Sequence, residues 1–450
     1  MMKLSRMLKL ALRARPLILA ALTVSASAED WPQWLGPQRD STWRESGIVE
    51  KFPQSGPRIL WRAAIGGGYS GPAVSKGRVY LTDRELATGV NNPSDPFQRG
   101  VIQGFERVLC FDERTGKLLW QHKYDCPYAM SYAAGPRSNP LLSDGKLYTL
   151  GGEGNLICLN ADSGKPVWQR ELKRDFNAKT PMWGFSGQLL VDGESLFVLA
   201  GGENATIAAF DKNDGKDLWR ALNAKEPGYS SPILIGSGAT RQLIVWNPES
   251  ANGLDPKTGK VLWTEPFPAK SGMSIATPRQ IGNQLLFTSF YNGSMMLRLD
   301  DNKPQVMWKT QKASEKETTQ LNAVMCTPFL EDGYIYGVCS YGQLRCLNAQ
   351  TGERIWETFK ATTDGEPVRW GNAFIVKNGN RFFLFNEKGD LIIAKLSPKG
   401  YEEISRAHVL EPTNRDPGRL VVWSHPAFAN RHVYARNDKE LIAVDLSENN

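Results

Sequence analysis

Short apolar runs alternate with turn-forming residues along most of the chain, and one such phrase recurs. An apolar run ends at Asp112, a Thr-Gly-Lys turn occupies 115–117, and a tryptophan follows at Trp120. The run that ends at Asn160 leads in the same way, through a Ser-Gly-Lys turn, to Trp168. Further copies end at Trp219, Trp263, Trp308 and Trp356. This pattern predicts two short β-strands joined by a tight turn in each copy, at a spacing of roughly 44 to 59 residues.

A second phrase precedes each copy and marks the start of another strand. It is a small residue, any residue and a proline, as in Ser70-Gly-Pro72. Clear copies begin at Ser70, Ser138, Ser230, Ala276, Cys326 and Ser424, and degenerate copies contain Gln188 and Asn372. A short strand, a turn and a second strand, such as 77–81 or 333–337, follow each copy. Each unit therefore supplies four strands, A to D, and eight A strands are predicted.

The two ends of the repeat array complement each other. Trp61 stands on a D strand that no C strand precedes, whereas residues 441–445 form a C strand that no D strand follows. Pairing of these two strands would complete an eighth blade and leave no open sheet edge. The sequence therefore predicts an all-β, eight-bladed propeller of four-stranded antiparallel blades over 61–450, closed by its N- and C-terminal strands.

The recurring phrase indicates a structural role for its residues. Glycine adopts the positive φ of a tight turn, and a large indole buries surface against a neighbouring blade. The copy at Trp308 has lost the glycine, and the copy near Leu396 has lost the tryptophan, with Ile404 expected in its place. The tryptophans interpreted as structural, not as ligand platforms, are Trp61, Trp120, Trp168, Trp219, Trp263, Trp308 and Trp356.

The first 60 residues stand outside the repeat. Residues 1–28 combine five basic residues, a short apolar run and a Ser-Ala-Ser-Ala end at Ala28, which is typical of a cleaved signal peptide. Residues 29–60 are rich in tryptophan and proline, and we expect them to pack across the propeller. The net charge of +7 falls to +2 without the leader, so charge gives no case for a nucleic-acid partner. No second long apolar run predicts a transmembrane segment in the mature chain.

The longer connections of the predicted propeller gather on one face. They are the B-to-C insertion 85–106 and the stretches 122–137, 171–185, 309–325, 357–370 and 405–423, which lead into A strands. Long loops on a rigid scaffold are the usual place for binding. Aromatic and polar residues at the starts of the A strands are expected to surround the channel mouth, as a ligand or partner site. They are Tyr69, Arg137, Asn139, Trp183, Gln188, Tyr229, Asn322, Trp370, Asn372, Trp423 and His425.

The Asp-x-x-Thr-Gly-Lys-x-x-Trp phrase resembles the pyrroloquinoline-quinone-like propeller repeat family over roughly residues 31–445. This family includes quinoprotein alcohol dehydrogenases and BamB outer-membrane assembly proteins. The opening at 30–40 is similar to the start of secreted bacterial members. The quinoprotein branch implies a vicinal disulfide, a calcium ion and a catalytic aspartate, whereas this chain has no adjacent cysteines and no Cys-x-x-Cys-His haem motif. The BamB branch implies a propeller whose loops engage partner proteins.

Cysteine and histidine provide no recognisable reactive or metal-binding motif. Cys110, Cys158 and Cys346 occupy the same C-strand position as alanine in other copies, which indicates a small buried residue. Cys339 and Cys346 flank one hairpin and could pair if the register allows it. The histidines, at 122, 408, 425 and 432, lack metal-ligand spacing.

Together these features favour an exported, non-catalytic binding or scaffolding propeller that is BamB-like and periplasmic or secreted. Its partner would be an envelope protein or a small molecule on the long-loop face. The alternative is an oxidoreductase that binds pyrroloquinoline quinone (PQQ) with calcium, or another small molecule.

Overall fold

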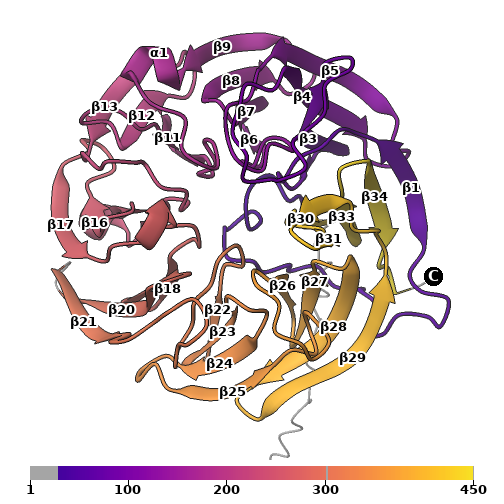
Figure 1. Cartoon of the computed structure of the whole chain (residues 1–450), viewed down its shortest axis with the longest axis vertical. Helices are drawn as coiled ribbons and strands as arrows, with labels where there is room; N and C mark the ends of the chain where they lie inside the picture. Colours follow the sequence, from indigo (N-terminus) through magenta and orange to yellow (C-terminus); the bar gives the residue numbers. More distant parts are fainter. Residues whose placement is uncertain (1–28, 301–302, 449–450) are drawn as a thin grey trace, which may run out of the picture.

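The computed structural model describes residues 29–300 and 303–448. Within these ranges, eight four-stranded antiparallel sheets stand around a common axis (Figure 1). A two-stranded hairpin and the short helix α1 (Leu172–Phe176) lie in connections between blades. The predicted all-β, eight-bladed propeller is confirmed. The predicted leader, residues 1–28, lies outside the described residues.

In each blade the strands follow one another outward from the axis (Figure 1), and in three pairs of adjacent blades the first strands contact each other. The first two blades are β2 (Ala73–Ser75), β3 (Arg78–Leu86), β4 (Gly104–Asp112), β5 (Leu118–Asp125), and β6 (Leu141–Ser143), β7 (Lys146–Leu150), β8 (Asn155–Asn160), β9 (Pro166–Glu171). The next two are β10 (Leu190–Asp192), β11 (Ser195–Leu199), β12 (Ile207–Asp211), β13 (Asp217–Ala221), and β14 (Ile233–Ile235), β15 (Gln242–Trp246), β16 (Ser250–Leu254), β17 (Val261–Pro266).

The remaining blades repeat this order. The fifth and sixth are β18 (Arg279–Ile281), β19 (Gln284–Ser289), β20 (Gly293–Asp300), β21 (Lys303–Lys309), and β22 (Phe329–Glu331), β23 (Tyr334–Val338), β24 (Leu344–Asn348), β25 (Arg354–Thr358). The seventh is β26 (Ala373–Asn378), β27 (Arg381–Asn386), β28 (Asp390–Ser397), β29 (Gly400–His408). The eighth is β32 (Ala427–Ala429), β33 (His432–Arg436), β34 (Glu440–Asp445) and β1 (Ile59–Ala64).

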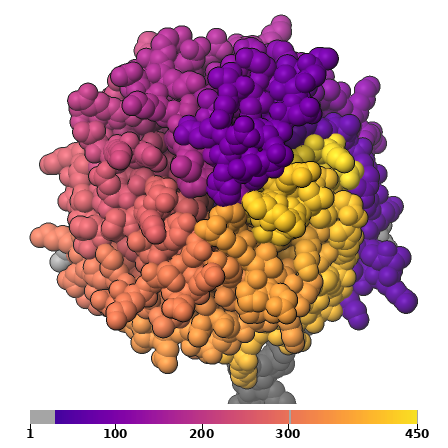
Figure 2. Space-filling model, in the orientation of Figure 1, coloured from indigo at the N-terminus to yellow at the C-terminus, as the bar shows by residue number. Residues whose placement is uncertain are grey.

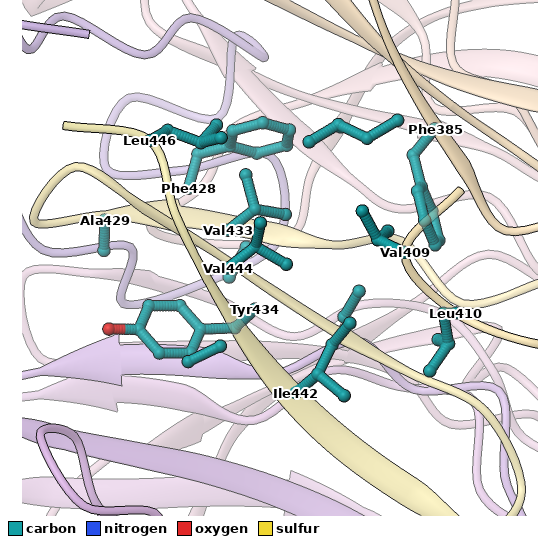
Figure 3. Close-up of a cluster of buried hydrophobic side chains, with 14 of the residues drawn as sticks. Phe385, Val409, Leu410, Phe428, Ala429, Val433, Tyr434, Ile442, Val444 and Leu446 are labelled. Atoms are coloured by element: carbon teal, nitrogen blue, oxygen red, sulfur yellow. The ribbon is translucent and has the colours of Figure 1, made fainter. Parts of the chain in front are cut away.

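The eighth blade closes the ring with strands from both ends of the chain. β1 pairs antiparallel with β34 and places Trp61 opposite Ala443. Phe385, Val409 and Leu410 of the seventh blade region pack with Phe428 and Ile442 of the eighth in one buried cluster (Figure 3). The predicted closure is therefore confirmed, and the last two blades share a continuous apolar core.

Most of the repeat tryptophans pack on the glycine turn of the following blade. The Gly164 turn lies so close to Trp120 that a Cβ atom at Gly164 would be 2.5 Å from the indole ring. The Trp120 Nε1–H also donates to the Ala161 carbonyl oxygen at 3.2 Å. The same ring-on-glycine contact joins Trp61 to Gly116, Trp168 to Gly215, Trp219 to Gly259 and Trp308 to Gly352. Each such contact joins the rim of one blade to the outer turn of the next.

Three positions depart from this arrangement. The Trp356 Nε1–H donates to the Ser397 carbonyl oxygen of the seventh blade at 2.8 Å, but a Cβ atom at Gly400 in that turn would face open space. Trp263 faces a blade whose sequence has no glycine between β20 and β21, and its Nε1–H donates to Gln242 Oε1 of its own blade at 2.6 Å. The outer strand of the seventh blade has no glycine turn to pack on. The strands β34 and β1 of the eighth blade come from opposite chain ends, so no turn joins them. Its strand β29 carries Ser405, not a tryptophan, opposite Ile393.

The expectation that Ile404 replaces the missing tryptophan is wrong by one residue. Each outer strand has a bulge just before the tryptophan position, and Ile404 is the bulged residue of β29. The backbone amide of Phe52, which precedes β1, donates to Ser405 Oγ at 3.1 Å. Phe52 is buried in the same cluster that Ile404 packs against. The N-terminal segment thus supplies apolar contact where the repeat lacks its tryptophan.

Residues 29–58 cross the face of the ring that carries the A-to-B turns (Figure 1). Trp31 pairs with Val74 of the first blade, and Thr42 pairs with Lys377 of the seventh. The Trp31 and Trp43 rings are almost fully buried, and both pack against Phe428. This N-terminal segment therefore contacts the blades on both sides of the eighth, closing blade.

The six cysteines are all buried and unbridged within the described residues. Cys346 lies opposite Tyr336 in the β23–β24 register, while Cys339 follows the end of β23. The pairing of Cys339 with Cys346, left open by the sequence, is therefore not formed. Among the described residues, no helix has the length and apolar character needed to cross a bilayer.

We expect Gly164→Ala to destabilise the propeller more than Gly145→Ala. Both glycines have positive φ, 68° and 75°, so alanine costs about 1–2 kcal/mol at either position. Only Gly164 faces a ring, and overpacking adds about 1–3 kcal/mol there, whereas Gly145 faces open space. Denaturant unfolding of the two variants measures the difference. Equal losses would show that the tryptophan–glycine contact contributes little to stability.

Candidate functional site

The long connections lie on the face opposite the N-terminal segment. The first-blade insertion is shorter than expected, because β3 extends to Leu86 and β4 begins at Gly104. The stretch 405–423, expected as a loop, contains the end of β29 and a hairpin of β30 (Asn414–Asp416) and β31 (Arg419–Val421). Paired strands replace part of both predicted loops, so this face is more rigid than the sequence suggested.

A chamber of about 200 Å³ lies on the axis beneath these connections. Eight of the predicted site residues line it: Tyr69, Arg137, Trp183, Gln188, Tyr229, Trp370, Trp423 and His425. The sequence prediction missed ten other lining residues, Trp34, Phe97, Tyr132, Ser186, Ser231, Met273, Ile275, Val324, Met325 and Phe374. Trp34 and Phe97 come from outside the repeat, so alignment of the blades gave no signal for them.

The three predicted asparagines do not line the chamber. Asn139 occupies the place in its phrase that His425 occupies in another blade, but its Oδ1 accepts from the Gly71 amide at 2.8 Å. The Asn322 Nδ2 donates to the Ser314 carbonyl oxygen at 2.6 Å. Asn372 is buried, and its carbonyl oxygen accepts from the Glu387 amide. All three make hydrogen bonds with backbone groups around the chamber, and none of them is among the residues that line it.

The N-terminal segment forms the floor of the chamber. The Trp34 ring lies edge-on to His425, with centroids 5.0 Å apart, and its Nε1–H donates to Thr277 Oγ1 at 3.0 Å. Phe374 packs against the other side of His425 at 5.0 Å. The segment therefore closes one end of the axial channel.

An aromatic cluster forms the roof. Phe97 from the first-blade insertion lies 5.1 Å from the Tyr132 ring and 5.8 Å from Trp370. Trp370 in turn lies 6.5 Å from Trp423. Figure 2 shows the purple, orange and yellow side chains of this face meeting over the middle of the ring. The chamber is therefore covered by loops from distant parts of the chain.

A buried ionic network anchors the β30–β31 hairpin beside the roof. The Arg419 Nε–H donates to Glu387 Oε1 at 3.0 Å, and Arg419 also pairs with Asp416. The hydroxyl of Tyr132 donates to Asp416 Oδ1 at 2.9 Å, and the Trp423 Nε1–H donates to Glu387 Oε2 at 3.1 Å. Burial raises the pKa of both carboxyl groups despite their pairing with Arg419. The network fixes two roof rings, Tyr132 and Trp423, to one hairpin.

The chamber interior combines a cation with a neutral imidazole. Arg137 lies over the Tyr69 ring at 4.8 Å, and burial raises the pKa of that tyrosine. His425 is buried, and desolvation lowers its pKa from 6.5 to about 4. Its Nδ1 lies 2.7 Å from the Pro426 carbonyl oxygen, so the Nδ1 carries the proton and Nε2 is an acceptor.

The lining residues do not fit a calcium-bound quinone. None of them is an aspartate or a glutamate, and the asparagines Asn139, Asn322 and Asn372, whose amide oxygens could otherwise contribute, lie outside the lining. Calcium requires several hard oxygen ligands. No cluster of three or more acidic, histidine or cysteine side chains suitable for a metal occurs in the described parts of the chain. We therefore derive no redox chemistry for this site.

Comparison with known proteins places the chain in a family. The family model described as outer membrane protein assembly factor BamB matches residues 104–358 and 305–450, more than half of the chain. The chain belongs to the BamB family. BamB of Yersinia pestis is 25% identical over 289 residues, 60% of this chain and 72% of that protein. BamB of Escherichia coli K12 is 26% identical over 293 residues, 63% of this chain and 70% of that protein.

Solved structures share the propeller fold. The crystal structure of BamB from Moraxella catarrhalis gives a TM-score of 0.53 at 16% identity and covers 80% of this chain and 99% of that one. The quinohemoprotein alcohol dehydrogenase from Comamonas testosteroni gives 0.61 at 14% identity, covering 94% and 81%. At these identities the likeness shows the fold alone, which both branches of the predicted repeat family share.

We expect His425 to remain neutral at mildly acidic pH. Since its folded pKa of about 4 lies below the ordinary 6.5, it contributes stability that is present above pH 6.5 and is lost as the pH falls toward 4. The loss amounts to about 3 kcal/mol. The free energy of unfolding should therefore depend less on pH across this range for His425→Gln than for the native chain.

Nuclear magnetic resonance titration of the histidine rings provides the direct measurement. His408 serves as an internal comparison: partial burial lowers its pKa, but hydrogen bonds to Asp390 and Glu411 raise it above the ordinary value overall. A His425 ring that titrates near 6.5 would contradict the buried, neutral state described above.

Proposed function

We propose that this chain is a non-catalytic scaffolding propeller that binds an envelope protein on its long-loop face during outer-membrane protein assembly. Membership of the BamB family, whose model matches residues 104–450, is the observation that carries this proposal. The curated relatives named outer membrane protein assembly factor support it. The donor set of the chamber gives no support to the quinone-dependent alternative.

The location follows from the same proposal. A BamB-like role requires a protein in the periplasm, which agrees with the signal peptide expected at 1–28. No lipid-attachment cysteine stands near Ala28, so we propose a periplasmic protein released from its leader. The mature net charge near zero favours a protein partner over nucleic acid.

Three exposed apolar side chains mark the surface that we propose for the partner. Phe97, Met182 and Leu420 come from three different connections and form what we call the roof patch. Ser131 joins two of them, because its Oγ–H donates to the Phe97 carbonyl oxygen and its amide donates to that of Met182. Ser94 of the same insertion lines a small groove with Leu420. Exposed apolar side chains on a rigid support are typical of docking sites.

We expect substitution of the roof patch to weaken partner binding. The double variant Phe97→Ser and Leu420→Ser removes apolar area that the partner would bury, so occupancy should fall by roughly tenfold or more. A photocrosslinking residue at position 182 measures occupancy in cells. The amount of heat-modifiable, folded outer-membrane β-barrel protein in a strain that lacks the native gene measures function.

A matched control is available on the rim of the propeller. Leu218 is 49% exposed and Leu262 is 47% exposed, close to the 39% of Phe97 and 51% of Leu420. Leu218→Ser with Leu262→Ser should leave crosslinking and barrel assembly unchanged. The proposal fails if the roof variant restores assembly fully while the rim variant does not.

A further inference from the structure

The chamber beneath the roof patch has the shape and surface of a site for a flat molecule. Tryptophan rings stand on several sides, at Trp34, Trp183, Trp370 and Trp423. Between them lie apolar side chains such as Met273 and the methyl groups of neighbouring aliphatic residues. Stacking against such walls favours a planar aromatic body, and a volume of about 200 Å³ suits a single ring with short substituents.

Two hydrogen-bond donors of the chamber have no acceptor within the described chain. The Tyr229 side chain is 5% exposed, and its hydroxyl donates to no described atom. The buried Trp370 Nε1–H likewise has no acceptor there. A buried donor left unsatisfied costs about 1–3 kcal/mol, and both residues line the chamber, so a bound oxygen acceptor that reaches either donor would be favoured.

Among the described residues that line the chamber, Arg137 alone carries a charge. Arg137 lines it, and the two terminal nitrogens of its guanidinium donate to the carbonyl oxygens of Gly135, Ser131 and Tyr132. Because carbonyl oxygens carry no full charge and no lining residue is acidic, the cation is not neutralised inside the chamber. Arg137 therefore supplies attraction for an anion, while Tyr229 and Trp370 supply the donors.

The opposite end of the chamber offers an acceptor. The Nδ1–H of His425 donates to the Pro426 carbonyl oxygen, which leaves Nε2 to accept a hydrogen bond. Trp34 and Phe374 hold this imidazole between them at 5.0 Å each. A hydroxyl group on the bound molecule would satisfy Nε2.

We infer that the chamber binds a small hydroxylated aromatic carboxylate. Its ring stacks among the tryptophans, and its oxygens accept from Tyr229 and Trp370 in the field of Arg137. Its phenol donates to His425. The chamber shares Phe97 with the roof patch, whereas Met182 and Leu420 lie outside its lining, so a variant of Leu420 tests partner docking separately from acid binding. Pyrroloquinoline quinone carries three carboxylates, and the chamber offers one cation for them.

Binding is measured with 4-hydroxybenzoate and 4-hydroxycinnamate as the probes. Quenching of tryptophan fluorescence reports occupancy directly, since four tryptophans line the chamber, and a thermal shift should accompany it. The methyl esters of both probes and the cation tyramine have similar rings without the negative charge. We expect both acids to bind and each comparison compound to bind at least roughly tenfold more weakly.

Tyr229→Phe removes one donor and keeps the ring, so it should weaken binding of the acids by roughly fivefold to tenfold. Tyr401→Phe makes the same change on β29, away from the chamber, and should leave affinity unchanged. The inference is overturned if neither acid binds at millimolar concentration, if esters bind as well as acids, or if Tyr401→Phe weakens binding as much as Tyr229→Phe. Binding of the quinone alone, without the small acids, would also overturn it.

The same Tyr229→Phe protein separates this inference from the proposed function. It should crosslink to its partner and support barrel assembly at the native level, because the roof patch is unchanged. Loss of partner binding in the single variant Leu420→Ser, which leaves the chamber lining unchanged, with retained acid binding would show that the two surfaces act separately.

Discussion

The contact between a tryptophan on one blade and the glycine turn of the next joins five of the eight pairs of adjacent blades. The hydrogen bonds of each sheet do not extend to the neighbouring sheet, so the packing of adjacent sheets against each other depends on side chains. A Cβ atom on Gly116, Gly164, Gly215 or Gly259 would come within 2.7 Å of a preceding indole, so only glycine allows this approach. Because one phrase contributes both the turn and the ring, the copies at Trp120, Trp168 and Trp219 contact both the blade before and the blade after their own.

The eighth blade explains why the seventh blade lacks the tryptophan–glycine contact. Strands β34 and β1 lie at opposite chain ends, so no glycine turn joins them and the seventh blade has nothing to receive a tryptophan. Ser405 stands at that position, and its Oγ accepts a hydrogen bond from the backbone amide of Phe52 in the N-terminal segment. The same segment carries Trp34 to the chamber floor. Closure of the ring and enclosure of the site therefore depend on one stretch of chain.

The sequence predicted the features that recur in every blade. It missed features that depend on a bulge, on a single side-chain contact or on an insertion. Strand order, closure and the shared position of Cys110, Cys158 and Cys346 all followed from spacing, because each blade obeys the same register. Ile404 was misplaced because a bulge shifts the register by one residue. Asn139 was misassigned because its short side chain reaches a neighbouring amide, and Phe97 was missed because an insertion has no counterpart in other blades.

The pairing of β1 with β34 also sets the order in which the chain can fold. If the chain crosses a membrane from its N-terminus, β1 arrives first and finds its partner strand last. Until then β1 presents an unpaired edge, and such edges pair readily with other chains. Contacts between distant parts of a sequence also form slowly. The chain thus passes through an open-edged state that ends only when β34 has formed and paired with β1.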